Sequence, residues 1–392
     1  MARSVNEKVC SVEKQNVLMV ADMDLSKTSG EVIRTIALAT ELQKKLKVTL
    51  LAPEPKNSVK FELNRINTVY VPVKNEGGSV LNIYKRTRAL INEAKKISKG
   101  NILIIETTPV AGYFALAGFS GYVVDVHGIY FSELDYANSP WFVPKKPYKI
   151  FTKYLERSAL KKAGRINTVS KTMMNFINTE FNAPKNKIEL ISNGFFEDKV
   201  LNTEKKKIKE IKGRVAFVGN LAKWANVDKI INAANILRDE NVTFYIIGDG
   251  IYRQGVEGLI KKYKLSNVIL TGYKPLDEAY EIIAQSQIML LPFPKDICTE
   301  IACPIKVLEY MAFGKAMVID EVDDVSKLLK KNNAALVCDP DNEEDFAESI
   351  LFLLNNEKIR KEIGNNARLL SKEFSWKTQG QKLVEVLENI NG

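Results

Sequence analysis

A lysine and a glutamate three residues apart are the first candidates for chemistry in this sequence. Residues 298–314 read CTEIACPIKVLEYMAFG, in which Pro304 suits the first turn of a helix. The free amides of such a turn, near Pro304, Ile305 and Val307, can bind phosphate oxygens, and Lys306 adds a positive charge. Glu309 lies on the same helix face, where its carboxylate could accept hydrogen bonds from a ribose diol. An ordinary ion pair on a surface helix is the alternative interpretation.

The single histidine of the chain, His127, is a second candidate. It follows the apolar run 121–126 and precedes Gly128, which places it at the end of a predicted strand. Ligands of open α/β sheets bind at the carboxyl ends of the strands, so we expect His127 to face a cleft. A histidine satisfied in the core or in a turn is the alternative.

A glycine-rich turn, Gly248-Asp249-Gly250, follows the strand-like run 242–247. Glycines at a strand end let the backbone approach a ligand, and the N-terminus of a following helix favours an anion. A tight turn without a ligand explains the same residues. The third glycine of a dinucleotide fingerprint would fall at Arg253, so the sequence does not support a nicotinamide site.

The cysteine and histidine counts exclude several classes of site. None of the 4 cysteines forms a C-x-x-C pair, which argues against zinc ribbons and thioredoxin-like redox chemistry. So few thiols fit a reducing compartment. The 1 histidine excludes multi-histidine metal sites. We expect the adjacent Asp323 and Asp324 to be solvated in a loop, and we see no buried carboxylate pair for a double displacement.

These candidates need rigid elements to hold them, and strand and helix patterns alternate along all 392 residues. Short apolar runs such as 16–23 and 102–106, separated by amphipathic segments such as 30–46, predict parallel sheets covered on both faces. The lysine-rich stretch 199–212 interrupts the pattern and is the predicted linker. The sequence therefore predicts an α/β fold of two doubly wound halves that face each other across a cleft.

The positive charge of the chain is concentrated in its first half. Residues 1–200 carry 30 Lys and Arg against 19 Asp and Glu, a net of +11, whereas the remaining residues carry 27 against 28. A basic half attracts an anionic partner such as nucleic acid, a phospholipid surface or a phosphorylated substrate. General solubility is the alternative explanation.

Neither a leader peptide nor a membrane span is expected. Residues 1–15 are polar and lack the apolar core of a signal peptide. Residues 107–124 form an uncharged run, but its proline and three glycines favour a short helix and a strand over a membrane span. We expect a cytoplasmic protein, at the inner face of the cell membrane if the basic half binds lipid.

From Val215 onward, a series of motifs resembles one known family. The segments VAFVGNLAKWANVDKIINAA, YIIGDG, VILTGY, IMLLPF, CPIKVLEYMAFGKAMVI and LVCDPDNEEDFAESI occur in the order and spacing of the donor-binding half of the retaining glycosyltransferases of family 4. The resemblance implies the GT-B fold, with two Rossmann-like domains. It implies an acceptor-side domain of residues 1–205, a donor domain of residues 206–375, and a C-terminal helix, residues 376–392, that crosses back.

The resemblance also assigns roles to residues of the second half. Glu309 matches the second glutamate of the E-x7-E motif and would hold the ribose, whereas the first glutamate falls at Ile301, with Glu300 one residue early. The arginine expected after the strand that ends at Gly219 is Asn220. Lys223 and Lys306 are therefore the basic candidates for the diphosphate, while the turn 248–250 and the segment ending at Tyr273 would contact the base.

In the first half the resemblance covers four strand ends. Residues 169–170 and residues 191–194, ISNG, resemble the family's later strand ends, the second of which usually reads P-N-G. Residues 27–31, KTSGE, are similar to the family's glycine loop, whose backbone approaches the donor phosphates, with Ser29 in place of one of two adjacent glycines and Gly30 retained. Residues 123–128, VVDVHG, are similar to the strand that ends in a histidine. The resemblance places His127 beside the donor sugar.

The function implied is transfer of a sugar from a UDP- or GDP-type nucleotide-sugar to a glycan or lipid-linked acceptor, with retention at the anomeric carbon and without a metal or other cofactor. We assign His127 and Lys306 the catalytic roles. Cations expected to dock on an anionic membrane, interleaved with Tyr84 and with Trp141 and Phe142, are Lys85, Arg86, Arg88, Lys95, Lys96, Lys99, Lys145, Lys146 and Lys149.

Three alternatives remain open at this stage. The missing arginine and first glutamate would also fit a catalytically weak partner or scaffold protein. A nucleotide-sugar epimerase on the same fold would change the sugar without an acceptor. A nucleic-acid partner would explain the basic half, but no aromatic and basic motif of a known binding module supports it, and none is expected.

Overall fold

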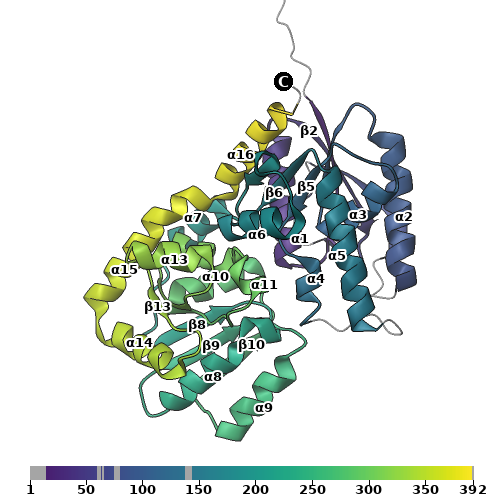
Figure 1. Ribbon diagram of the computed structural model, residues 1–392. Coiled ribbons are helices and arrows are strands. Elements are labelled where there is room, and N and C mark those ends of the chain that lie inside the picture. The colour runs from purple at the N-terminus through teal and green to yellow at the C-terminus, as the bar shows by residue number, and fades with distance from the viewer. Residues whose placement is uncertain (1–14, 60–62, 64–65, 75–79, 137–143, 391–392) are drawn as a thin grey trace, which may run out of the picture.

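The computed structural model describes residues 15–59, 63, 66–74, 80–136 and 144–390. Residues 1–14 and the Trp141–Phe142 pair lie outside this part of the chain. Two lobes follow each other along the chain, the first above the second in Figure 1, and each is built on one parallel sheet. The predicted α/β fold of two doubly wound halves is confirmed.

The first sheet has seven strands in the order β3-β2-β1-β4-β5-β6-β7. Its strands are β1 (Asn16–Val20), β2 (Lys47–Glu54), β3 (Asn67–Lys74), β4 (Ile102–Glu106), β5 (Val123–Val126), β6 (Arg165–Thr168) and β7 (Ile188–Leu190). All pairings are parallel, with Val17 opposite Val48 and Ile102 on the two sides of β1. The order reverses between β1 and β4, so the ends of β1, β4 and β5 open toward a switch point where ligands bind.

Helices cover both faces of this sheet. They are α1 (Gly30–Gln43), α2 (Val80–Ile97), α3 (Thr108–Leu116), α4 (Tyr130–Glu133), α5 (Lys145–Lys162) and α6 (Lys171–Phe181). The α1 helix packs one face, with Val32, Ile36 and Leu42 buried, and α3 and α5 pack against each other on the opposite face. Residues 107–124 accordingly contain α3 and the first two residues of β5. Within the described residues no helix is long and apolar enough to cross a membrane.

The second sheet has six strands in the order β10-β9-β8-β11-β12-β13. Its strands are β8 (Arg214–Val218), β9 (Thr243–Ile247), β10 (Val268–Gly272), β11 (Ile288–Leu291), β12 (Ala316–Asp320) and β13 (Leu336–Cys338). Its helices are α8 (Val227–Ile236), α9 (Arg253–Tyr263), α10 (Leu276–Gln285), α11 (Ile297–Glu300), α12 (Ile305–Ala312), α13 (Asp324–Lys331), α14 (Glu343–Asn355) and α15 (Glu357–Ser371). Strands β11 and β12 are buried throughout, as continuous apolar runs require.

The chain returns to the first lobe at its C-terminal end. Helix α16 (Trp376–Glu388) packs against α1, and a parallel bridge joins Phe195 to Ser375 just before it. Figure 1 shows this yellow helix running from the second lobe up the side of the first. Ser375 caps the helix by accepting a hydrogen bond from the Thr378 amide.

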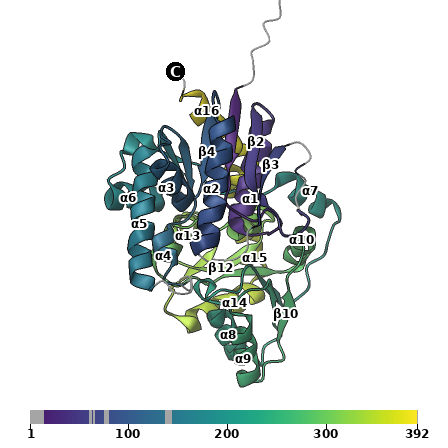
Figure 2. The same ribbon diagram turned by 90° about the vertical axis from the view of Figure 1, so that its right-hand side faces the viewer.

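Part of the predicted linker is helical. Residues 199–205 belong to α7 (Glu197–Lys205), which begins with two acidic residues that suit a helix N-terminus. Buried Val200 and Thr203 fix it, and it packs against α10, which lies beside it in Figure 2, and against α12 of the second lobe. Two surface ion pairs, Lys199–Asp277 and Lys206–Glu281, lie along the same contact. Charge-rich composition predicted a linker because the two buried positions are too few to produce an apolar run. The division at residue 205 remains a prediction.

Candidate functional site

The ammonium group of Lys306 is buried in an aromatic cage. Its Nζ lies 4.5 Å from the centre of the Phe217 ring, 5.7 Å from that of Trp224 and 5.8 Å from that of Phe293. No hydrogen-bond partner for this Nζ occurs in the described part of the chain. Burial lowers the pKa of Lys306 to about 8, and the charge of Glu309 opposes this shift. Burying an amine without a hydrogen-bond partner is costly, and the three aromatic rings offset part of this cost for the charged form.

Glu309 lies one helical turn beyond Lys306 and is also buried. Its Oε1 accepts a 2.9 Å hydrogen bond from the Tyr280 hydroxyl. Burial raises the pKa of Glu309 to about 7, although Tyr280 and Lys306 both favour its ionised form. Lys306 and Glu309 form no ion pair within 4 Å in the described structure, and Glu309 is buried. The interpretation of their spacing as an ordinary ion pair on a surface helix is therefore wrong.

Two helix N-termini from different domains meet beside the cage. A Cβ atom at Gly30, the first residue of α1, would lie 3.7 Å from Ile305 Cδ1 at the start of α12. Neither helix has a side-chain cap in the described structure, since Ser29 and Pro304 make no capping hydrogen bond. Apart from the Val307 amide, which donates to the Pro304 carbonyl at 3.1 Å, the first amides of both helices therefore remain available to an anion.

Glycines bring the strand-end loops of the second sheet close together. Gly248 has φ +140°, and a Cβ there would lie 1.8 Å from the Gly219 carbonyl oxygen. A Cβ at Gly250 would lie 2.3 Å from the Leu221 carbonyl oxygen. These contacts explain Gly248 and Gly250 by backbone packing between loops, which favours the tight-turn interpretation of the motif.

The other predicted donor-site residues lie on surrounding loops. Lys223 is exposed in a short 3-10 turn, with its Nζ 5.9 Å from the centre of the Tyr252 ring. Asp249 is exposed and pairs with Arg253 at 3.6 Å, and Tyr273 is 42% exposed after β10. Their roles remain predictions. Val307, in the first turn of α12, is buried, and its amide already donates to the Pro304 carbonyl.

The position of the family's first glutamate is occupied by a core residue. Ile301 is 1% exposed, and Glu300 precedes it as the last residue of α11. Asp296 caps this short helix in a reciprocal capping box with Thr299. Whether Glu300 serves the donor sugar stays a prediction.

His127 follows β5 as predicted, above a buried polar cluster. Its Nε2 is buried without a hydrogen-bond partner in the described structure. Burial lowers the pKa of His127, while the charges of Asp125 and Glu31 oppose this shift. The imidazole is therefore neutral at physiological pH, and its free Nε2 can take part in a hydrogen bond with a ligand.

The polar cluster below His127 is centred on Arg34, a residue that sequence reasoning missed. Its Nε and Nη2 donate to the two carboxylate oxygens of Asp125 at 2.6 and 2.8 Å, and both residues are 1% exposed. Burial disfavours the charged Asp125, but Arg34 outweighs this effect and lowers its pKa. Asp125 lies within an apolar strand, and a buried carboxylate requires a cation nearby. This was the one signal in the sequence that a buried arginine or lysine must pair with it.

Glu106 completes the cluster and corrects the expectation that no buried carboxylate pair exists. Its carboxylate, that of Asp125 and a ring nitrogen of His127 lie within 4.8 Å of one another. Burial and the neighbouring Asp125 raise the pKa of Glu106 well above its usual range, which favours its neutral form. Both oxygens of Asp125 are occupied by Arg34, so the three groups do not fit a cation site as they stand.

Other acidic pairs are structural. The expectation that Asp323 and Asp324 are both solvated in a loop is wrong for Asp323, which is 2% exposed and caps α13. Asp324 is half-buried at the start of α13 and accepts hydrogen bonds from the Thr172 amide and hydroxyl. An Asp-x-Asp spacing occurs at Asp22 and Asp24. Asp22 pairs with Arg86 at 2.6 Å, and Asp24 accepts hydrogen bonds from Ser26. A second such spacing, Asp339-x-Asp341, lies beside the contact described next.

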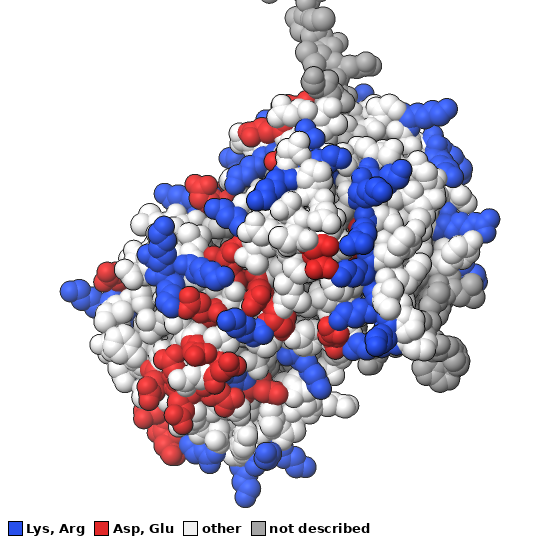
Figure 3. Space-filling model, in the orientation of Figure 1, with Lys and Arg blue, Asp and Glu red and all other residues white. Residues whose placement is uncertain are grey.

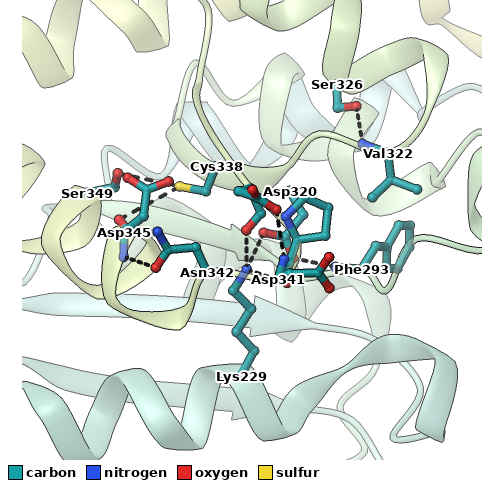
Figure 4. A network of polar contacts seen from close by, with 12 residues as sticks. Lys229, Phe293, Asp320, Val322, Ser326, Cys338, Asp341, Asn342, Asp345 and Ser349 are labelled. Atoms are coloured by element: carbon teal, nitrogen blue, oxygen red, sulfur yellow. Dashed lines mark hydrogen bonds and ion pairs between the residues drawn. The ribbon is translucent and has the colours of Figure 1, made fainter.

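A second buried ion pair supports the aromatic cage. Lys229 Nζ donates to Asp320 at 2.7 Å and to the carbonyls of Asp339 and Pro340 (Figure 4). The other carboxylate oxygen of Asp320 accepts a 2.9 Å hydrogen bond from the Phe293 amide. Lys229 therefore fixes, through Asp320, the backbone of a residue that contacts Lys306.

The surface charge separates by lobe. In Figure 3, Lys and Arg side chains are spread over the first lobe, whereas acidic side chains gather on the second lobe near α14. The first turn of α14 contains Glu343, Glu344 and Asp345. Arg86 does not belong to the docking cations predicted from the sequence, since it is 7% exposed and paired with Asp22.

Comparisons with known proteins agree with this architecture. Residues 198–370 match the model of the glycosyl transferases group 1, and residues 28–198 match that of glycosyltransferase family 4. An uncharacterized glycosyltransferase of Methanocaldococcus jannaschii is 29% identical over 175 residues, which is 45% of this chain and 48% of that protein. The N-acetyl-alpha-D-glucosaminyl L-malate synthase of Bacillus anthracis is 23% identical over 60% of this chain and 61% of its own length. The chain thus spans about half to three-fifths of these relatives.

Solved structures share the fold at low identity. Sucrose-phosphate synthase from Thermosynechococcus elongatus superposes with a TM-score of 0.79 at 13% identity, covering 96% of this chain and 99% of that one. Anabaena HepE in complex with UDP-glucose gives 0.73 at 16% identity, covering 95% and 99%. Together with the two family matches, these findings show that the chain belongs to the group 1, family 4 type of glycosyltransferases with the GT-B fold.

Proposed function

We propose that this glycosyltransferase moves a sugar from a UDP- or GDP-type donor to a glycan or lipid-linked acceptor, with retention and without a metal. The observation that carries the proposal is Lys306, a buried cation without a partner in the described structure, beside the uncapped N-termini of α1 and α12. Two helix dipoles and one ammonium group suit a diphosphate. HepE, which has the same fold, is known in complex with UDP-glucose.

The same groups support a mechanism through stabilisation of the leaving group. When the bond between the anomeric carbon and the phosphate oxygen breaks, Lys306 and the amides of α12 would stabilise the negative charge of the diphosphate. The acceptor oxygen bonds to the same face of the carbon, and its proton leaves with the diphosphate. Glu309 would accept hydrogen bonds from the ribose, and neutral His127 would hold a sugar hydroxyl.

Nucleotide binding tests this proposal first. We expect UDP or GDP to raise the melting temperature of the full chain, because a ligand at 100 times its Kd adds about 2.7 kcal/mol. Lys306→Met should abolish the shift, while Lys295→Met, which removes an exposed lysine just before α11, should not. No response to any nucleoside diphosphate would contradict the proposal.

Activity assays test the two alternative functions. Sugar transfer by the purified chain would exclude the catalytically weak partner. Conversion of a nucleotide-sugar without an acceptor would favour the epimerase.

Peripheral membrane contact through the first lobe belongs to the same proposal. Exposed apolar side chains line one side of α5, with Ile150 67%, Tyr154 53% and Phe151 42% exposed around an open hollow that Lys146 and Pro147 also line. Lysines and arginines border a white band in the region of α5 in Figure 3. Cations beside exposed aromatic and aliphatic groups suit an anionic bilayer surface.

Liposome sedimentation tests this contact. Binding to vesicles that contain phosphatidylglycerol should weaken with salt and with the double substitution of Ile150 and Tyr154 by serine. Leu369→Ser removes an equally exposed side chain from α15 of the second lobe and should have no effect. Equal binding to neutral vesicles, or none to anionic ones, would contradict the membrane part alone.

A further inference from the structure

Two side chains of the first domain hold the main chain of the loop that leads into α12. Ser170 Oγ donates a 2.6 Å hydrogen bond to the Ile301 carbonyl, and Asn193 Nδ2 donates a 2.7 Å hydrogen bond to the Cys303 carbonyl. Ile301 and Cys303 are both buried. Because α12 begins directly after this loop, these bonds fix the start of the helix that carries Lys306.

Asn193 is itself held from within the first domain. Arg34 Nη1 donates to Asn193 Oδ1 at 3.1 Å and to the Ser192 carbonyl at 2.9 Å. The same guanidinium group pairs with Asp125, two residues before His127. A continuous series of hydrogen bonds therefore runs from β5, through Arg34 and Asn193, to Cys303.

We propose that Asn193 is a positioning residue that sets the first turn of α12, and with it Lys306, relative to the strand end that carries His127. The inference rests on the proposed function, since these groups must act on one donor. The amide suits this task because it accepts from the guanidinium and donates to the carbonyl at once. An aspartate would keep the first contact and lose the second.

A contact elsewhere between the domains provides the matched control. Thr172 binds Asp324 through its amide at 2.9 Å and through its hydroxyl at 2.7 Å. Asp324 begins α13, which carries none of the site groups. Thr172→Val removes one hydrogen bond between the domains without touching the loop before α12.

Hydrogen exchange followed by mass spectrometry tests positioning without any ligand. In Asn193→Ala and Asn193→Asp, amides of residues 301–307 should exchange about tenfold faster than in the wild type, whereas Thr172→Val should leave them unchanged. Unchanged exchange at 301–307 in both Asn193 variants would overturn the inference. If Asn193→Ala does not fold, the aspartate variant alone decides.

Binding of UDP or GDP, measured by calorimetry on the same full-length variants, tests the consequence. We expect about tenfold weaker binding for both Asn193 variants and none of this loss for Thr172→Val. Faster exchange with unchanged affinity would overturn the positioning role. If the wild type binds neither nucleotide, the proposed function fails, while the exchange result still decides whether Asn193 fixes α12.

Discussion

A Cβ atom at Gly219 would lie 2.4 Å from the Nζ of Lys306. The glycine at the end of β8 thus leaves the space that the ammonium group occupies in its aromatic cage. The atom that such a Cβ would meet is the far end of a flexible side chain, whereas at Gly248 it would meet a backbone oxygen at 1.8 Å. Gly219 therefore leaves space for a site side chain, whereas Gly248 allows the close packing of two backbone segments.

We expect Gly219→Ala to weaken UDP or GDP binding about tenfold with a small loss of stability, because Lys306 must move and the Phe217 ring, whose Cζ would lie 3.1 Å from the new Cβ, must shift slightly. Gly248→Ala should lower the free energy of unfolding by several kcal/mol, since its φ of +140° and the backbone contact both exclude a side chain. Gly258→Ala, in α9, whose Cβ would meet no atom within 4 Å, is the tolerated control. Calorimetry and urea denaturation separate the two effects. Equal destabilisation at Gly219 and Gly248 would contradict this assignment.

Nucleotide binding should weaken as the pH rises above about 8. Burial lowers the pKa of Lys306 to about 8 in the free protein. A bound diphosphate favours the ammonium form and raises that pKa, so binding takes up a proton once the free lysine is neutral. Affinity should then fall by up to tenfold per pH unit. Lys306→Arg, which stays charged, should remove this alkaline dependence in calorimetric titrations. A wild-type affinity that does not change across this range would show that Lys306 does not contact the phosphates.

The acidic limb of the same profile should respond to Tyr280. Burial raises the pKa of Glu309 to about 7, and the hydrogen bond from Tyr280 lowers it. If ionised Glu309 binds the ribose, affinity falls as the pH drops below about 7. Tyr280→Phe should move this limb to higher pH, whereas Tyr154→Phe, on the exposed side of α5, should not. A limb unaffected by Tyr280→Phe would assign the titration to another group.

Arg34 should be essential for stability. Arg34→Met leaves Asp125 buried without its cation, which typically costs about 3–5 kcal/mol. The double variant with Asp125→Asn should recover part of this loss, because it removes the uncompensated charge. Arg88→Met, an exposed arginine on α2, serves as the control in urea denaturation. A double variant less stable than Arg34→Met would argue against the ion pair as the source of the effect.

The sequence by itself was sufficient to predict the order of the strands and helices and the positions of several site residues. Continuous apolar runs predicted the buried parallel strands, because a strand covered by helices on both faces has apolar side chains at every position. Helical spacing placed Lys306 and Glu309 on one face, and the strand before His127 placed it at a sheet edge. These predictions depend only on local periodicity and on motif spacing. The helical first part of the predicted linker, residues 199–205, was missed because α7 buries only two side chains, Val200 and Thr203.

Tertiary structure alone decided how these residues behave. Phe217, Trp224 and Phe293 come from three separate segments, so the cage that desolvates Lys306 has no local signature. The burial of Arg34 likewise requires β5 and the loop at residues 191–193, which are about 90 and 160 positions away. Burial and pKa depend on what packs around a group, and packing between distant segments is a property of the folded chain.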